Sequence, residues 1–179
     1  TPLAPHVWAP PPPPRRPRAG RPHYARCSDE IPRLDRFVGE VLADLDAQAV
    51  ADNTLVIFFS DNGRPFPRDK TTLYDSGIRT PLIVRWPAVV KRGTRCKQLV
   101  SSVDLATTIL SVANVKPGRT FGGKDFSPLL RGEDIEIRDA IFAEKNWHDY
   151  EDRSRAVRDK RYKYIINHYL DLPGTPPAD

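Results

Sequence analysis

Two side chains with oxygen donors, Asp61 and Asn62, come directly after an apolar run, residues 55–59. A short run rich in β-branched and aromatic residues is typical of a strand buried in a parallel sheet. In open α/β sheets, ligands bind just beyond the carboxyl ends of the strands, which is where this pair is placed. Carboxylate and amide oxygens suit Ca²⁺ or Mg²⁺ better than a soft metal. The pair is therefore a candidate metal site, with a plain turn as the alternative.

One lysine, Lys70, lies in the loop that follows, residues 64–77, which holds two prolines. A loop of this composition is expected to be ordered rather than to form a helix or strand. An ammonium group is a compact point charge that suits a tetrahedral oxyanion. Lys70 is therefore a candidate ligand for an anionic substrate beside the metal, while simple solvation of an exposed lysine is the alternative.

The first 26 residues form a Pro/Arg-rich segment with nine of the 19 prolines, five arginines and no acidic residue. This composition is typical of extended polyproline II conformation rather than of packed structure. The segment is expected to be a linker, an arm, or a ligand for an SH3-type domain or an anionic surface. It contains two Pro-His pairs, at His6 and His23, and a histidine in such an arm is ordinarily solvated.

The helices and strands that the sequence predicts, and that must position these residues, indicate an α/β domain. An apolar stripe at spacings of three and four predicts an amphipathic helix over residues 28–47, and residues 101–113 predict a second, mostly buried helix. Asp104 lies in the first turn of that helix, where the helix dipole stabilises a negative charge. This role is expected for it rather than a role in chemistry. Strands are predicted at 54–59, 82–86, 140–143 and, as a pair around Asp159-Lys160, within 156–166. A helix, a short loop and a buried strand are half of an α/β unit.

The charge balance excludes one class of partner. Residues 27–179 carry 23 basic and 23 acidic residues, because the net charge of +5 comes from the arginines of the first segment. A nucleic-acid-binding domain would concentrate its basic residues on the folded part, so no nucleic acid is expected. No run of about 20 apolar residues predicts a membrane span. Cys27 and Cys96 lack metal-ligand spacing but could pair with each other.

The order and spacing of several segments resemble the second half of a sulfatase. These segments are Ser60-Asp-Asn-Gly63, Lys70, Leu73-Tyr-Asp-Ser-Gly-Ile-Arg-Thr-Pro81, Leu82-Ile-Val-Arg-Trp-Pro87 and Val103-Asp-Leu-Ala-Thr-Thr-Ile-Leu110. The tail is similar to the heparan N-sulfatase-like subgroup, through Trp147-His-Asp-Tyr150, Arg155-Ala-Val-Arg158 and Arg161-Tyr-Lys-Tyr164. The resemblance covers about residues 23–170.

The resemblance implies an alkaline-phosphatase-like α/β fold with a small β-rich C-terminal part. It implies that Asp61 and Asn62 bind Ca²⁺, with Mg²⁺ as a possible substitute, and that Lys70 contacts the substrate sulfate. His6, the best match to the Pro-His of the family, would lie beside the leaving-group oxygen. His148 would face the sugar of a sulfated small molecule or glycan.

One departure from the family concerns the nucleophile. Sulfatases use a formylglycine made within a Cys/Ser-x-Pro/Ala-x-Arg motif, and neither cysteine of this chain fits it. The expected arrangement is an extended segment (residues 1–26), the C-terminal part of a catalytic α/β domain (27–135) and a small strand region (136–179). The missing N-terminal part of the same enzyme would be its partner, a view that the absence of Met supports.

Two alternatives to an active sulfatase remain. An inactive sulfatase remnant would keep the fold without the nucleophile. Another alkaline-phosphatase-superfamily enzyme, such as a phosphodiesterase or phosphonate-type hydrolase, would use two transition metals with histidine ligands close to an aspartate. No Asp-x-x-x-His cluster accompanies Asp61, which disfavours this second alternative.

Overall fold

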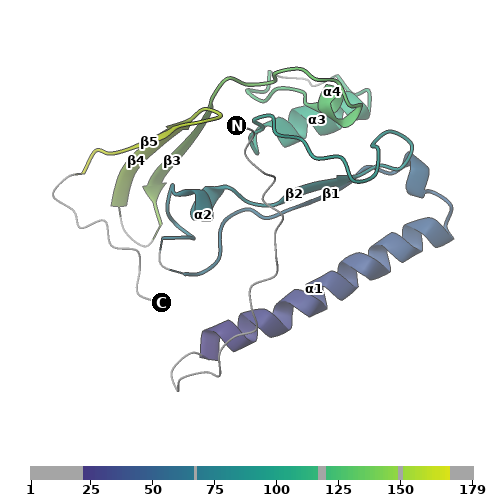
Figure 1. Cartoon of the computed structure of the whole chain (residues 1–179), viewed down its shortest axis with the longest axis horizontal. Coiled ribbons are helices and arrows are strands. Elements are labelled where there is room, and N and C mark those ends of the chain that lie inside the picture. The colour runs from purple at the N-terminus through teal and green to yellow at the C-terminus, as the bar shows by residue number, and fades with distance from the viewer. Residues whose placement is uncertain (1–21, 67, 117–119, 149–150, 170–179) are drawn as a thin grey trace, which may run out of the picture. The chain divides into compact units, whose positions relative to one another are not determined.

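The computed structural model describes residues 22–66, 68–116, 120–148 and 151–169, so the predictions for His6 and residues 1–21 lie outside the described residues. The chain forms two compact units, residues 1–49 and residues 50–179. In chain order the elements are α1 (Pro22–Ala47), the 3₁₀ helix η1 (Ala51–Asn53), β1 (Val56–Phe59), α2 (Asp75–Ile78), β2 (Leu82–Arg85), α3 (Asp104–Val112), α4 (Ser127–Leu130), β3 (Ile141–Trp147), β4 (Glu151–Arg158) and β5 (Lys163–Asn167) (Figure 1).

The helix of the first unit, α1, begins six residues before the predicted start at residue 28. Residues 22–26, which were expected to be extended, are therefore helical. Proline is favoured in the first turn of a helix, because its fixed φ is helical and its missing N–H has no intrahelical partner there, so Pro22 is a suitable first residue. Neither α1 nor any other helix in the described part of the chain has the length and apolarity needed to cross a bilayer.

In the second unit, β1 and β2 form a two-stranded antiparallel sheet in which Val56 pairs with Arg85 and Phe59 with Leu82 (Figure 1). The prediction that the strand at 54–59 belongs to a parallel sheet and is buried on both faces is wrong for the described residues. The connection between the strands contains one short helix, α2. The connection, residues 60–81, exceeds the roughly dozen residues that a parallel crossover needs, so its length does not decide the strand direction, and the antiparallel pairing is established by the register. Within β1, Val56, Ile57 and Phe58 are only half-buried, and Phe59 is exposed.

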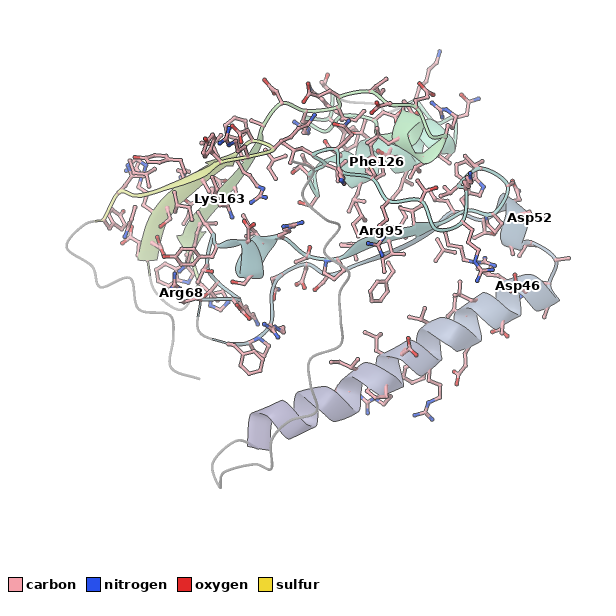
Figure 2. All side chains as sticks on the ribbon, in the orientation of Figure 1. Asp46, Asp52, Arg68, Arg95, Phe126 and Lys163 are labelled. Atoms are coloured by element: carbon pink, nitrogen blue, oxygen red, sulfur yellow. The ribbon has the colours of Figure 1, made fainter. Side chains whose placement is uncertain are left out.

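A small apolar core forms below α3 and α4, from the buried residues Phe126 (labelled in Figure 2), Leu129 and Ile137. The second predicted helix is confirmed as α3, but it is not mostly buried. Its fully buried residues are the polar Asp104 and Thr108, while Ile109 is 46% exposed. The segment between α3 and β3 contains the one-turn helix α4, which brings Leu129 into this core.

Asp104 is the polar centre of this part of the fold. Its carboxylate receives two hydrogen bonds from Arg138 Nε, at 2.9 and 3.1 Å, and one from Arg138 Nη2. The backbone N–H groups of Ser101 and Lys124 also donate to it, at 2.8 and 2.7 Å. Burial alone would raise the pKa of Asp104, but these hydrogen bonds and the Arg138 charge outweigh it and hold the pKa below its usual range. Asp104 lies in the first turn of α3, as expected, and it also has a structural role through its ion pair with Arg138.

The C-terminal strands form a three-stranded antiparallel sheet in the order β3-β4-β5 (Figure 1). The predicted strand pair around Asp159-Lys160 is confirmed as β4 and β5, in which Val157 pairs with Tyr164. The strand predicted at 140–143 is longer than expected, because β3 continues to Trp147 and pairs with β4 along its length. Cys96, for which the sequence left open a pairing with Cys27, is exposed and free.

Candidate functional site

The loop after β1, residues 60–63, is held in place by short-range hydrogen bonds. Ser60 Oγ donates to the Asn62 carbonyl oxygen at 2.9 Å, and the Asn62 N–H donates to Asp61 Oδ1 at 2.9 Å. The Gly63 N–H then donates to the Gly77 carbonyl oxygen of α2 at 2.9 Å. The contact is so close that a Cβ on Gly63 would lie 2.0 Å from the Ser76 carbonyl oxygen. The residue type at position 63 thus lets the Asp61-Asn62 loop pack directly against α2.

The segment before α2 also folds back against it. A Cβ on Gly77 would lie 2.2 Å from the Asp69 carbonyl oxygen and 2.4 Å from that of Thr72. Ser76 Oγ donates to the carbonyl oxygen of Arg68 at 2.7 Å. These contacts make residues 68–74 an ordered loop, as the sequence predicts, but the end of the predicted loop is helical, because α2 begins at Asp75.

Lys70 lies in this loop between two residues with left-handed backbone conformation, Arg68 and Thr71, each with φ of 67°. Such a conformation is uncommon for residues other than glycine and is maintained by surrounding contacts. Here the Lys70 N–H donates to the Arg64 carbonyl oxygen at 2.9 Å, and buried Asp69 pairs with Arg64 at 3.3 Å. The Lys70 side chain is exposed and has no ion-pair partner among the described residues. Its backbone is fixed while its ammonium group is available to a ligand.

Four of the five predicted site residues line one polar pocket of about 210 Å³. Asp61, Asn62 and Lys70 come from the two loops described above, and His148 follows β3. The fifth predicted residue, His6, lies outside the described residues. The polar pocket also includes residues that sequence reasoning did not assign to it: Thr71, Thr72, Leu73, Gly77, Ile78, Glu144, Lys145 and Trp147.

The β3 side of the polar pocket contains a paired cation. Lys145 Nζ lies 2.8 Å from Asp152 on β4, and both side chains are mostly buried. Burial would raise the pKa of Asp152, but the hydrogen bonds and charge of Lys145, together with Ser154, lower it. Lys145 and Trp147 are two residues apart on β3 and so share a face with each other. The adjacency of Trp147 to His148 in the sequence was the signal that could have identified Trp147.

The α2 side of the polar pocket is fixed to the C-terminal sheet through Asp75. Arg158 Nη1 lies 2.7 Å from both carboxylate oxygens of Asp75, and Lys163 Nζ lies 2.9 Å from Oδ1. Lys163, labelled in Figure 2, also donates to the Leu73 carbonyl oxygen. Burial would raise the pKa of Asp75, but Lys163 and Arg158 outweigh that effect and lower it.

The oxygen donors of the polar pocket fit a hard cation as part of a larger ligand set. Asp61 is exposed and makes no ion pair with any described residue, so its carboxylate is available. Among the described residues, no group of three or more His, Cys, Asp or Glu side chains could hold a metal. Ca²⁺ takes six to eight oxygen ligands. Asp61 and Asn62 can therefore contribute to such a site but cannot complete it.

A second, larger pocket of about 610 Å³ has a different character. Alternate residues of one face of the β1 segment, Leu55, Ile57 and Phe59, line it together with Leu105 and others from α3. None of its lining residues has a titratable side chain. This apolar pocket offers no acid, base or nucleophile and is not a candidate for chemistry.

Two family models match the chain. The model described as Sulfatase matches residues 1–115, and the model described as N-sulphoglucosamine sulphohydrolase, C-terminal, matches residues 66–173. An ulvan-active sulfatase of Formosa agariphila is 40% identical over 152 residues, covering 84% of this chain and 25% of that protein. The N-sulphoglucosamine sulphohydrolase of Homo sapiens is 33% identical over 167 residues, covering 87% of this chain and 33% of that protein.

Solved structures share the fold. A 2-O GAG sulfatase superposes with a TM-score of 0.65 and 23% identity, covering 75% of this chain and 31% of that one. A phosphonate monoester hydrolase from Silicibacter pomeroyi superposes with a TM-score of 0.64 and 26% identity, covering 74% and 30%. The chain thus spans about a quarter to a third of the length of the relatives that it matches.

Proposed function

Because this chain belongs to the sulfatase family, with a partial alkaline-phosphatase-like α/β fold, we propose that it forms the sulfate-binding side of a sulfuric ester hydrolase site. Its relatives include proteins named ulvan-active sulfatase, N-acetylgalactosamine-6-sulfatase and N-sulphoglucosamine sulphohydrolase. A sulfated sugar, esterified or N-sulfated, is the substrate class that these names support for the whole enzyme.

The observation that carries the proposal is the composition of the polar pocket. A lysine, two oxygen donors and a histidine converge there from segments that are up to 87 residues apart in sequence. Lys70 offers a positive charge that binds a sulfate oxygen and neutralises negative charge as the sulfur is attacked. His148, which lines the same pocket, is proposed to contact the sugar to which the sulfate is attached.

Asp61 and Asn62 are the residues that would hold the metal. When bound, Ca²⁺ (or Mg²⁺ in its place) would supply Lewis-acid stabilisation of the negative charge on the sulfate group. The carboxylate of Asp61 is oriented by the N–H of Asn62, so both donors belong to one rigid loop. Further oxygen ligands are required to complete the set of six to eight.

Two further contributions complete the proposed site. His6 is proposed to give a proton to the departing alcohol or amine, a general-acid role that the resemblance to the family implies. The nucleophile, a formylglycine, is proposed to lie outside this chain, in an N-terminal part of the same enzyme. We therefore expect the isolated chain to bind ligand without turnover, and measurable sulfatase activity from purified residues 1–179 would contradict this.

The metal role is tested by titrating the chain with Ca²⁺ in a calorimeter. Asp61→Ala should weaken Ca²⁺ binding at least tenfold, because a carboxylate supplies most of the charge of the ligand pair. Asp52→Ala, which removes an exposed carboxylate from η1 outside the polar pocket, is the matched control and should bind as wild type does. Equal affinities for wild type and Asp61→Ala would overturn the assignment.

A second function is kept because of one observation, the structural likeness to a phosphonate monoester hydrolase. Phosphonate and phosphate monoesters present a tetrahedral anion like that of sulfate, and Lys70 would suit both. Competition between sulfate and methylphosphonate for the polar pocket distinguishes the sulfatase function from the phosphonate hydrolase function. Preference for sulfate supports the sulfatase assignment, preference for phosphonate supports the alternative, and binding of neither indicates an inactive remnant.

A further inference from the structure

Trp147, the last residue of β3, is a large aromatic residue that remains exposed beside the polar pocket. The half-buried residues of β3 are Ile141, Ala143 and Lys145, and the alternation of burial ends there, because Asn146 and Trp147 are both exposed. Trp147 is 67% exposed, because it lies at the rim of the polar pocket. β3 thus ends in an exposed tryptophan that lines a pocket instead of packing into the core.

The strand pairing changes at this position. Lys145 pairs with Ser154, but Trp147 pairs with Glu151, so β4 contains one residue more than β3 between the two pairs. A bulge of this kind bends the strand locally and redirects side chains, and it is frequent beside functional sites. The bulge and the exposed indole coincide at the point where β3 meets the polar pocket.

The polar pocket combines two features that suit one ligand class. Asp61, Asn62 and Lys70 form a polar, partly cationic wall, whereas Trp147 offers the broad aromatic surface on the β3 side. A pyranose ring has hydroxyl groups at its edge and C–H groups on its faces. Those C–H groups carry partial positive charge and are attracted to the negative face of an aromatic ring. A sulfated sugar matches both walls.

We propose that Trp147 is the sugar-binding platform of this pocket, stacking its indole on the pyranose ring of a sulfated hexosamine whose sulfate contacts Lys70. This inference rests on the proposed function and adds to it the residue that recognises the ring. The sulfate supplies the charge interaction, and the indole distinguishes a sugar sulfate from the free anion. Trp147 therefore determines affinity for the organic part of the substrate.

The test compares two probes, glucosamine N-sulfate and inorganic sulfate, in the presence of Ca²⁺, with dissociation constants taken from backbone amide shifts of the ¹⁵N-labelled chain. Trp147→Ala should weaken glucosamine N-sulfate binding about fivefold, while inorganic sulfate binding stays within about twofold of wild type. Trp147→Phe should retain most of the affinity. Unchanged sulfate binding also shows that the variant is folded.

Phe142→Ala is the matched control, because Phe142 is a similarly exposed aromatic residue (74%) on the other face of β3 and outside the pocket lining. It should leave both dissociation constants unchanged. The inference is overturned if Trp147→Ala weakens both probes equally, if it weakens neither, or if wild type binds the sugar sulfate no better than sulfate. A Lys70→Ala variant that binds inorganic sulfate as wild type does would instead overturn the proposed function, and this inference with it.

Discussion

Arg158 of β4 contacts both carboxylate oxygens of Asp75, each at 2.7 Å, across 83 residues of sequence. Asp75 is the first residue of α2, whose Gly77 carbonyl oxygen receives the N–H of Gly63. A continuous series of contacts therefore links the C-terminal sheet to the loop that carries Asp61 and Asn62. The Arg-Ala-Val-Arg and Arg-Tyr-Lys segments, which suggested the family subgroup in the sequence, supply Arg158 and Lys163 to this link.

Removing the Asp75 charge should weaken that link. We expect Asp75→Asn to lower the free energy of unfolding by about 1–2 kcal/mol, a value reduced for solvent screening because the carboxylate is 42% exposed. Urea unfolding followed by circular dichroism measures it. Asp52→Asn, an exposed carboxylate of η1, should change stability by less than about 0.5 kcal/mol. If both variants unfold at the same urea concentration, the ion pairs of Asp75 contribute nothing.

A close backbone contact supports the Asp61-Asn62 loop, and Gly63→Ala should disrupt it. The added methyl group would meet the Ser76 carbonyl oxygen at 2.0 Å, an atom that cannot rotate away. We expect a loss of about 2 kcal/mol of stability and weaker Ca²⁺ binding, because the loop must move. Gly122→Ala has no atom within 4 Å of its new methyl group and is the matched control. Identical behaviour of the two variants would contradict the packing of this loop.

Stability should depend on pH through carboxylates whose pKa values are lowered in the folded chain, which are Asp75, Asp104, Asp125 and Asp152. A lowered folded-state pKa means that the unfolded chain takes up protons first. The stabilisation is therefore fully present above the unfolded-state pKa of about 3.8 and is lost as the pH falls below it. Each carboxylate contributes a slope of up to about 1.4 kcal/mol per pH unit in that range.

Asp104→Asn isolates one contribution to this pH dependence. Because Arg138 would be left without its buried partner, we expect a loss of about 3 kcal/mol at pH 7. The same variant should show a shallower fall in stability below pH 4, since one titrating group is gone. Unfolding curves at pH 7 and between pH 3 and 4 test both effects. A slope equal to that of wild type would exclude Asp104 from the acid transition.

The sequence predicted the elements that depend on local pattern. The apolar stripe identified α1, the apolar runs identified β1 and β2, and alternation identified the hairpin of β4 and β5. The sequence also identified four candidate residues that line one pocket, because each follows a recognisable element or motif. They are Asp61, Asn62, Lys70 and His148. Their functional roles stay predictions.

Features that depend on distant partners were not predictable in the same way. Strand direction for β1 and β2 follows from how a long loop returns, which apolar periodicity does not encode. Burial of α3 was overestimated, because its apolar residues depend on neighbouring segments for cover. Arg138 and Arg158 were not foreseen as partners of Asp104 and Asp75, since nothing in a local window connects residues 34 and 83 positions apart.

The central claim is that the polar pocket binds sulfate through Lys70, and a sulfate titration of the chain in the presence of Ca²⁺ tests it most directly. Lys70→Ala should raise the dissociation constant for inorganic sulfate about tenfold or more, because the charge that contacts the anion is lost. Lys97→Ala, which removes an exposed lysine outside the pocket, is the matched control and should bind as wild type does. A Lys70→Ala variant with wild-type affinity for sulfate would contradict the account.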